Sequence, residues 1–215
     1  MKKNKKFSFT LSILIINLIF YLIFLVAFYL NRNFIDYIAL KPANIVKGKY
    51  LWTIVTSMFA HSPASVFHIF ANMISLIFIG SFLERIIGRK RFIFIYLISG
   101  IIANLFFILF SLIFKNEFNA YALGASGAIF GLIGVVILLT PKLKVFVFPI
   151  PFPLPIWIAS LIALFGLWII SIIAGLPIGN TAHLGGFITG IFYGLYLRMK
   201  YKRKVALLNK YLGVK

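Results

Sequence analysis

The sequence of 215 residues has no cysteine and only three acidic residues, Asp36, Glu84 and Glu117. Without cysteine, the chain cannot form disulfide bonds, use a thiolate nucleophile or bind a metal through sulfur. An aspartyl protease of the membrane needs two facing carboxylates, and no apolar run here contains an aspartate. The three histidines do not form the His-Glu-x-x-His pattern of a helical zinc protease. We therefore expect neither a metal nor a cofactor.

Charged residues of both signs are also scarce, at 12% of the chain, whereas apolar residues make up 62%. Soluble domains have about 25% charged and 45–50% apolar residues. The mean hydropathy of +1.06 points the same way. A membrane-spanning helix needs about 20 residues, so six spans would occupy about 120 residues and leave only short loops. The composition predicts an all-α, polytopic membrane protein with no separate soluble domain.

The charge that is present is strongly positive, with 22 Lys and Arg residues and a formal net charge of +19. Such an excess is typical of proteins that bind nucleic acid or anionic lipid. In a chain with so much apolar sequence, we expect the partner to be the anionic head groups of a bilayer and not a nucleic acid.

Six apolar runs have spanning length, and sequence patterns place the ends of such runs to within a few residues. They cover approximately Thr10–Leu30, Val66–Leu83, Phe92–Phe114, Leu123–Thr140, Pro155–Leu176 and Thr181–Met199. This division predicts a basic N-terminal segment (1–9), a six-span membrane domain (10–200) and a basic tail (201–215). A loop of about 30 residues (31–60) separates the first two spans, and loops of that length are usually functional or packed.

The distribution of Lys and Arg predicts the orientation, because these residues remain on the cytoplasmic side of a span. With the N-terminus inside, 17 of the 22 lie in inside segments and five lie outside. Both termini are therefore expected in the cytoplasm of a multi-pass protein of the cell membrane. Spans two, four and six then run inward, so that residues near their starts lie in the outer part of the membrane.

Three polar side chains occupy those starts, namely His68, Ser126 and His183. Polar groups inside a span are functional candidates by default. Ser126 lies in Gly124-Ala125-Ser126-Gly127, where glycine lets other backbone approach a hydroxyl at the start of a helix. The structural alternative is that these small residues only allow close helix packing.

His183 is followed by glycines three, seven and eleven residues later, Gly186, Gly190 and Gly194. These share one helical face and could pack against the glycines of span four, Gly127, Gly131 and Gly134. That pairing would bring His183 within reach of Ser126 as a general base for a serine nucleophile. Without a nearby acid, the unit would be a Ser-His dyad, and Phe130 could stack on the imidazole. The structural alternative is a histidine bonded to a neighbouring carbonyl.

His68 and Asn72 are spaced i, i+4 and so project from one face of a helix. A histidine and an amide placed together suit an oxyanion hole, where donors meet the charge that develops on a carbonyl oxygen. The alternative is an interhelical hydrogen bond by Asn72 and an interfacial His68. His61, at the membrane boundary, is interpreted as structural.

Together these motifs resemble those of the rhomboid family of intramembrane serine proteases. The likeness rests on Gly124–Gly127, on Ala182-His183 with Gly186 and Gly190, on His61 through Met73, and on Leu83-Glu84-Arg85 with Gly88. It implies a six-helix bundle in which Ser126 is the nucleophile and His183 the base. It also implies that His68, Asn72 and the Ser126 N–H hold the oxyanion, in a site that opens to the extracytoplasmic side. Two positions depart from the family pattern, Thr53 in place of an arginine and Phe130 in place of a common tyrosine.

The favoured function is cleavage of transmembrane protein substrates in or next to their membrane helices. Such helices must unwind locally, which favours weak helix formers at the cleaved bond. A catalytically inactive relative that binds membrane proteins is the alternative, although it would not need the dyad and oxyanion residues. A small transporter is less favoured because acidic residues are absent from the middle of the spans.

Overall fold

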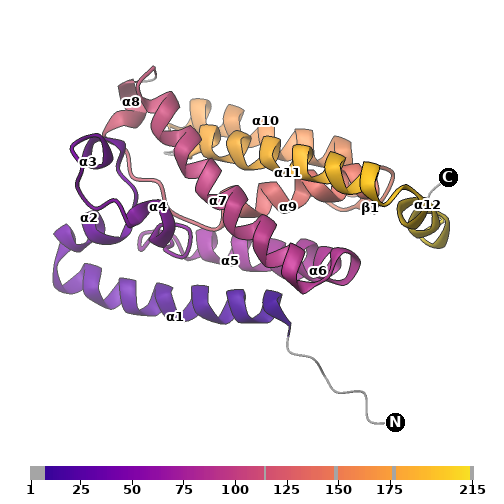
Figure 1. Ribbon diagram of the computed structural model, residues 1–215. Coiled ribbons are helices and arrows are strands. Elements are labelled where there is room, and N and C mark those ends of the chain that lie inside the picture. Colours follow the sequence, from indigo (N-terminus) through magenta and orange to yellow (C-terminus); the bar gives the residue numbers. More distant parts are fainter. Residues whose placement is uncertain (1–7, 114, 148–149, 176–177, 214–215) are drawn as a thin grey trace, which may run out of the picture.

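The computed structural model describes residues 8–113, 115–147, 150–175 and 178–213, and they form a bundle of long helices (Figure 1). The long elements are α1 (Phe9–Leu30), α5 (Val66–Ser75), α6 (Ser81–Ile87), α7 (Arg89–Ser111), α9 (Ser126–Leu139), α10 (Ile156–Ala174) and α11 (Asn180–Lys200). A π-helical segment, η2 (Leu76–Gly80), joins α5 to α6 into one continuous helix. A last helix, α12 (Lys202–Tyr211), follows α11.

Within the described ranges, four helices are long and apolar enough to cross a membrane, namely Phe9–Leu30, Val66–Ile87, Arg89–Ser111 and Ile156–Ala174. Helix α9 is apolar but has only 14 residues. Helix α11 has 21 residues, including four glycines. The helices begin and end within a few residues of the six predicted runs. The predicted ends at Phe114 and Leu176 lie outside the described residues.

The second helix is longer than its apolar run, continuing past Leu83 to Ile87. Leu83 and Ile87 are both buried, so this last turn packs on the bundle. Gly88 ends it with a positive φ of 81°, a backbone conformation that glycine adopts without a steric penalty. The all-α prediction is correct apart from a small antiparallel hairpin of β1 (Lys144–Val145) and β2 (Leu154–Pro155) between α9 and α10.

The centre of the bundle is the packing of α9 on α11. A Cβ atom added to Gly186 would collide with the carbonyl of Gly127, and one added to Gly190 would collide with the carbonyl of Gly131. The two backbones therefore approach as closely as glycine allows. The predicted pairing of these glycine faces is confirmed.

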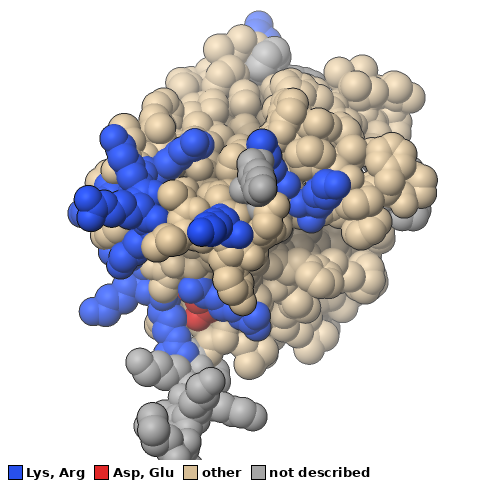
Figure 2. All heavy atoms as spheres, turned by 90° about the vertical axis from the view of Figure 1, so that its right-hand side faces the viewer, with Lys and Arg blue, Asp and Glu red and all other residues tan. Residues whose placement is uncertain are grey.

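The two ends of the bundle differ in structure and charge. At the end that we call the loop end lie the short elements η1 (Arg32–Phe34), α2 (Ile35–Ile38), α3 (Pro42–Val46), α4 (Thr53–Thr56) and α8 (Lys115–Phe118) (Figure 1). The opposite end, which we call the basic end, carries α6, the start of α7, and α12. Figure 2 views the molecule from this side and shows Lys and Arg side chains gathered on it.

Helix α1 is attached to the bundle at the basic end by Glu84 of α6. The Glu84 carboxylate accepts hydrogen bonds from the backbone N–H groups of Phe9 and Thr10, at 2.9 Å each. It also accepts from the hydroxyls of Ser8 and Thr10, at 2.7 Å each. An anion at the N-terminus of a helix satisfies free N–H groups and complements the helix dipole. One of the three acidic residues thus joins α1 to the rest of the protein.

Candidate active site

Ser126 is the first residue of α9 and is partly exposed. It lies at the end of α9 that is nearer the loop end, because Gly124 just before it bonds to Ser57 of the first loop. Because it begins the helix, its backbone N–H has no carbonyl partner within the helix. Gly124, two residues earlier, has φ of +120°, a conformation that residues with a Cβ rarely adopt. A Cβ at Gly124 would also lie only 2.8 Å from Nε2 of His68. Glycine at this position therefore allows His68 to approach the serine.

The segment before Ser126 is fixed by the first loop. Leu40 and Ala122 exchange two backbone hydrogen bonds of 3.0 and 2.8 Å. The hydroxyl of Tyr121 donates to Asp36 at 2.9 Å. The N–H of Gly124 donates to the carbonyl of Ser57 at 2.9 Å. The long loop is therefore packed, which is one of the two outcomes expected from its length, and it holds the extended segment that leads to the serine.

His183 lies in the first turn of α11, and its Nε2 atom is 2.8 Å from Oγ of Ser126. The ring of Phe130 stacks on the imidazole, with centroids 4.8 Å apart and planes inclined by 28°. His183 is buried, and its Nδ1 atom has no hydrogen-bond partner among the described residues. Among the described residues, the serine and the histidine thus form a pair with no third protein group, and the aromatic ring packs against the imidazole plane.

His68 lies in the first turn of α5 and accepts a hydrogen bond at Nδ1 from the backbone N–H of Ser62, at 3.3 Å. An imidazole that accepts at Nδ1 carries its proton on Nε2 when neutral. That nitrogen is the one adjacent to Gly124. The structure therefore directs a donor from His68 toward the backbone next to Ser126.

Asn72 follows one turn later and is buried. Its Nδ2 atom donates to the carbonyl of His68 at 2.8 Å. An amide nitrogen carries two hydrogens, so one donor remains for another acceptor. His61 is fully buried, with its ring centroid 5.3 Å from that of His68. Neither ring nitrogen of His61 has a hydrogen-bond partner among the described residues, so the interpretation of His61 as structural stays a prediction.

Several contributions to the site were not predicted. On α7, Ala103 lies where a Cβ on Gly127 would be, and Ser99 lies against Gly131, so small residues of a third helix complete the α9 packing. Ser99 and Ala103 are small residues spaced four apart, and this spacing was a sequence signal for the contact.

A second contribution that was not predicted is the hydrogen bond that the Thr181 hydroxyl donates to Glu117, at 3.0 Å, which joins the start of α11 to α8. No local pattern connects those two residues.

The departure at Thr53 has a structural explanation. Thr53 is buried, and its hydroxyl donates to the carbonyl of Tyr50 at 2.7 Å. Anchoring of the loop comes instead from α7, where the Asn104 amide donates to the Ile54 carbonyl and the Ser57 hydroxyl, at 2.8 and 2.9 Å. A polar anchor for the loop therefore exists, but it comes from a neighbouring helix.

The described residues contain no group of three or more His, Asp or Glu side chains placed to hold a metal ion. The groups that the structure brings together are the hydroxyl of Ser126, an imidazole that can accept its proton, and nearby N–H donors. This set matches the requirements of nucleophilic acyl transfer.

Comparison with known proteins gives a consistent result. Residues 48–200 match the family model described as the Rhomboid domain. The chain is 37% identical over 164 residues to RHOMBOID-like protein 1 of Arabidopsis thaliana, covering 73% of this chain and 37% of that protein. It is 31% identical over 147 residues to Rhomboid protein 1, mitochondrial, of Saccharomyces cerevisiae, covering 67% and 41%. It is also 34% identical over 153 residues to Inactive RHOMBOID-like protein 8 of Arabidopsis thaliana, covering 67% and 38%. The chain thus spans less than half the length of these relatives.

Proposed function

The chain belongs to the rhomboid family, and we propose that it is an intramembrane serine protease with Ser126 as nucleophile and His183 as general base. The observation that carries this proposal is the contact of 2.8 Å between Ser126 Oγ and His183 Nε2. A base within hydrogen-bond reach of a hydroxyl is the geometry that activates it for attack on a carbonyl.

In the proposed acylation step, Ser126 Oγ attacks the carbonyl carbon of the substrate and its proton moves to His183 Nε2. The negative charge on the carbonyl oxygen is stabilised by the Ser126 N–H, by His68 Nε2–H and by the second Nδ2 hydrogen of Asn72. When the C–N bond breaks, His183 returns the proton to the leaving amine. The product is a serine ester that retains the N-terminal part of the substrate.

Deacylation reverses these roles. A water molecule gives a proton to His183 Nε2 and attacks the ester carbonyl, and Ser126 leaves with the returned proton. Because His183 Nδ1 has no described partner, orientation of the imidazole depends on the Phe130 ring stacked against it. Phe130 lacks the hydroxyl that a tyrosine at this position would have. Ring stacking is therefore the only contact by which it orients the imidazole of His183.

The membrane arrangement is part of the proposal. We infer six spans, with the short α9 and the glycine-rich α11 surrounded by the four long apolar helices. The basic end would face the cytoplasm, as Lys and Arg flanking membrane spans generally do. The loop end, with the partly exposed Ser126, would then open to the extracytoplasmic side of a cell membrane. Water could reach the serine from that side.

The substrates would be proteins with transmembrane helices. In a helix, each carbonyl accepts a hydrogen bond from a backbone N–H of the same helix. The segment to be cleaved must therefore unwind at the membrane depth of Ser126. Residues with low helix propensity, such as Gly, Pro and Ser, lower the cost of this unwinding.

An inactive, substrate-binding member of the family is the second candidate, since one similar protein carries the word inactive in its name. The Ser126–His183 contact favours the protease, because a binder gains nothing from a base hydrogen-bonded to a hydroxyl. Incubation of the purified protein in liposomes with a single-span substrate would test the choice. Cleavage by the wild type and none by Ser126→Ala supports the protease, whereas substrate capture without cleavage by either protein supports the binder.

A further inference from the structure

The imidazole of His183 has one nitrogen that the proposed reaction leaves without a partner. Its Nε2 atom faces Oγ of Ser126 at 2.8 Å, whereas Nδ1 is buried and has no hydrogen-bond partner among the described residues. When Nε2 accepts the serine proton, Nδ1 must already carry a hydrogen, because a neutral imidazole has one donor and one acceptor nitrogen. His183 therefore needs an acceptor at Nδ1, both at rest and as the imidazolium ion.

Asn180, the first residue of α11, lacks the complementary partner. Its side chain is only 4% exposed, and its Oδ1 atom has no hydrogen-bond partner within the described part of the chain. The amide oxygen therefore does not accept a hydrogen bond from the N–H groups of its own helix. Buried polar groups in folded proteins are nearly always hydrogen-bonded. A buried acceptor thus lies three residues before a buried donor.

The two side chains lie on the same face of α11. Residues three apart in a helix have Cβ atoms about 5–6 Å apart, and helical side chains lean toward the N-terminus, so the imidazole of His183 leans toward Asn180. Two contacts fix this turn. The His183 N–H donates to the carbonyl of Gly179 at 3.1 Å, and the Thr181 hydroxyl donates to Glu117 at 3.0 Å.

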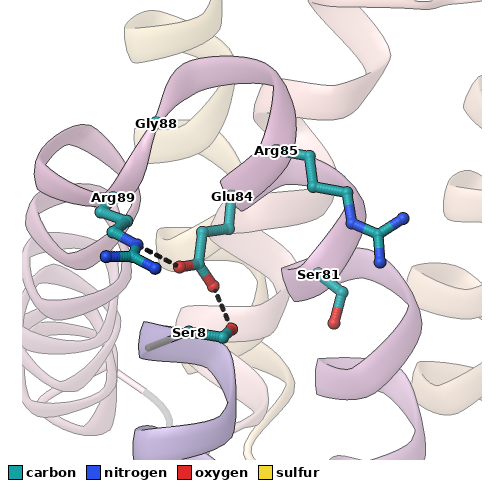
Figure 3. A pocket seen from close by; sticks show the side chains of 6 residues that line it. All are labelled: Ser8, Ser81, Glu84, Arg85, Gly88 and Arg89. Atoms are coloured by element: carbon teal, nitrogen blue, oxygen red, sulfur yellow. Dashed lines mark hydrogen bonds and ion pairs between the residues drawn. The ribbon is translucent and has the colours of Figure 1, made fainter. Parts of the chain in front are cut away.

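No acidic side chain takes the place of this amide. Glu84 lies at the basic end, where its carboxylate accepts from Ser8 at the start of α1 (Figure 3). Asp36 belongs to the packed first loop and accepts from the hydroxyl of Tyr121. The third acid, Glu117, already accepts from the threonine hydroxyl at the start of α11. The neutral amide of α11 is therefore the acceptor that the described residues offer.

One water molecule between the two side chains would satisfy both of them. Because Oδ1 and Nδ1 each lack a partner, they do not bond to each other directly. A water can accept from Nδ1–H and donate to Oδ1, and such bridges are nearly as favourable in enthalpy as a direct hydrogen bond. Buried waters occur where neighbouring polar groups would otherwise be unsatisfied.

We propose that Asn180 is a positioning residue for His183, whose Nδ1–H it holds through one bridging water molecule. The bridge keeps the hydrogen on Nδ1, so that Nε2 remains free to accept the proton of Ser126. It also stabilises the imidazolium ion that forms after the transfer. An asparagine orients the histidine in the Cys-His-Asn proteases of the papain type. The proposal rests on the assignment of His183 as the general base and adds a third member to the dyad.

The tautomer of His183 can be measured without any cleavage, by nitrogen-15 NMR of the full-length protein in lipid nanodiscs with its three histidines labelled. Replacing each histidine by Gln in turn would assign the signals. We expect the wild-type His183 to be protonated at Nδ1, with magnetisation transfer from water to that N–H. Asn180→Leu has the same branching and no acceptor, so it should increase the tautomer protonated at Nε2. An unchanged tautomer ratio would overturn the proposal.

Cleavage of a single-span substrate gives a second readout. Asn180→Leu should lower kcat about 10–100-fold at unchanged KM, because a hydrogen bond to a charged group contributes to stability on that scale. Asn180→Asp keeps an acceptor oxygen and should recover most of the loss. A raised KM at unchanged kcat would place Asn180 in substrate binding and contradict the positioning role.

The matched control is Asn17→Leu, the same change at another buried asparagine, which lies in α1. It should leave both kcat and the tautomer of His183 unchanged. Equal losses of kcat in the two variants would indicate general destabilisation and would overturn the proposal. If Asn180→Leu fails to fold, Asn180→Ala replaces it in both measurements. A wild type that does not cleave would contradict the protease, whereas the tautomer ratio would still decide whether Asn180 holds His183.

Discussion

The Nε2 atom of His183 lies 2.8 Å from Oγ of Ser126, although the two residues are 57 positions apart in the chain. The contact depends on Gly127 and Gly186, which follow the two residues by one and three positions and remove the side chains that would separate α9 from α11. The pair is therefore a consequence of backbone packing.

The first prediction concerns how the pair acts. Ser126→Ala and His183→Ala should each lower the rate of cleavage by at least about a thousandfold, and the double variant should be no slower than either. Residues that act as one unit show such non-additive losses. Rates of cleavage of a single-span substrate in liposomes, with thermal unfolding as a check on folding, would measure this. Losses that multiply in the double variant would assign the two residues independent roles.

The second prediction concerns the oxyanion donors. His68→Ala and Asn72→Ala should each reduce turnover by about 10²–10³ without abolishing it, because the Ser126 N–H remains and removal of one donor has a cost of that size. The reduction should appear in kcat more than in KM. A raised KM at unchanged kcat would mean that the two residues bind substrate and do not stabilise the transition state.

The third prediction concerns glycine packing. Gly190→Ala should destabilise the protein by about 1–3 kcal/mol or more, because overpacking a close contact has costs of that order and the new Cβ would collide with a backbone carbonyl. Gly166→Ala is the matched control. Gly166 lies inside α10 with no atom near its missing Cβ, so alanine there should be neutral or stabilise by up to about 1 kcal/mol. Equal unfolding temperatures for the two variants would contradict the packing argument.

Much of the fold and of the candidate site follows from sequence patterns because these patterns are local. Apolar runs have the length that a bilayer requires, and glycines at every third or fourth position define the faces of α9 and α11. The i, i+4 spacing of His68 and Asn72 is likewise a property of one helix. Such signals need no knowledge of distant contacts.

Other features depend on contacts between distant segments and leave no local signal. The sequence indicates that no acidic residue lies near Ser126 and His183, but nothing near Glu84 indicates that it binds the start of α1, where Thr10 is 74 positions away. The bridge between Leu40 and Ala122 is made by backbone atoms, which side-chain patterns do not report. The orientation of His68 similarly depends on a backbone N–H, that of Ser62.

The fourth prediction concerns acid stability. Burial lowers the pKa of His61 to about 3, assisted by the neighbouring His68 and opposed by the backbone of Phe59. In the unfolded chain the pKa is about 6.5, so between pH 6.5 and 3 the unfolded state binds more protons at this residue. The stability that His61 contributes is therefore present above pH 6.5 and is lost as the pH falls toward 3.

His61→Gln keeps hydrogen-bonding capacity and removes the titration. Unfolding temperatures measured between pH 7 and pH 4 should fall less steeply for this variant than for the wild type. Because His68 also faces this ring, His61→Gln/His68→Gln should be compared as well. Parallel pH profiles for wild type and His61→Gln would show that His61 is not buried in its neutral form.

The last prediction concerns how a membrane-embedded substrate reaches Ser126. In α10, the buried residues are Ile156, Ala159, Ser160 and Leu164, all in the first half, and none from Phe165 to Ala174 is buried. One half of this helix is thus held by the bundle, while the half that approaches the loop end packs loosely. Trp168 lies in that loose half and is partly exposed. We expect the opening for substrate between α10 and α5, with Trp168 filling part of it.

Trp168→Ala should therefore speed cleavage of a transmembrane substrate more than cleavage of a soluble peptide, because only the former must pass between the helices. Trp157→Ala provides a matched control. It makes the same change in the first turn of the same helix, in the half that is packed against the bundle. It should leave the ratio of the two rates unchanged. Equal effects of Trp168→Ala on both substrates, or a loss of thermal stability with no gain in either rate, would assign Trp168 to ordinary packing and place the entry of substrate elsewhere in the bundle.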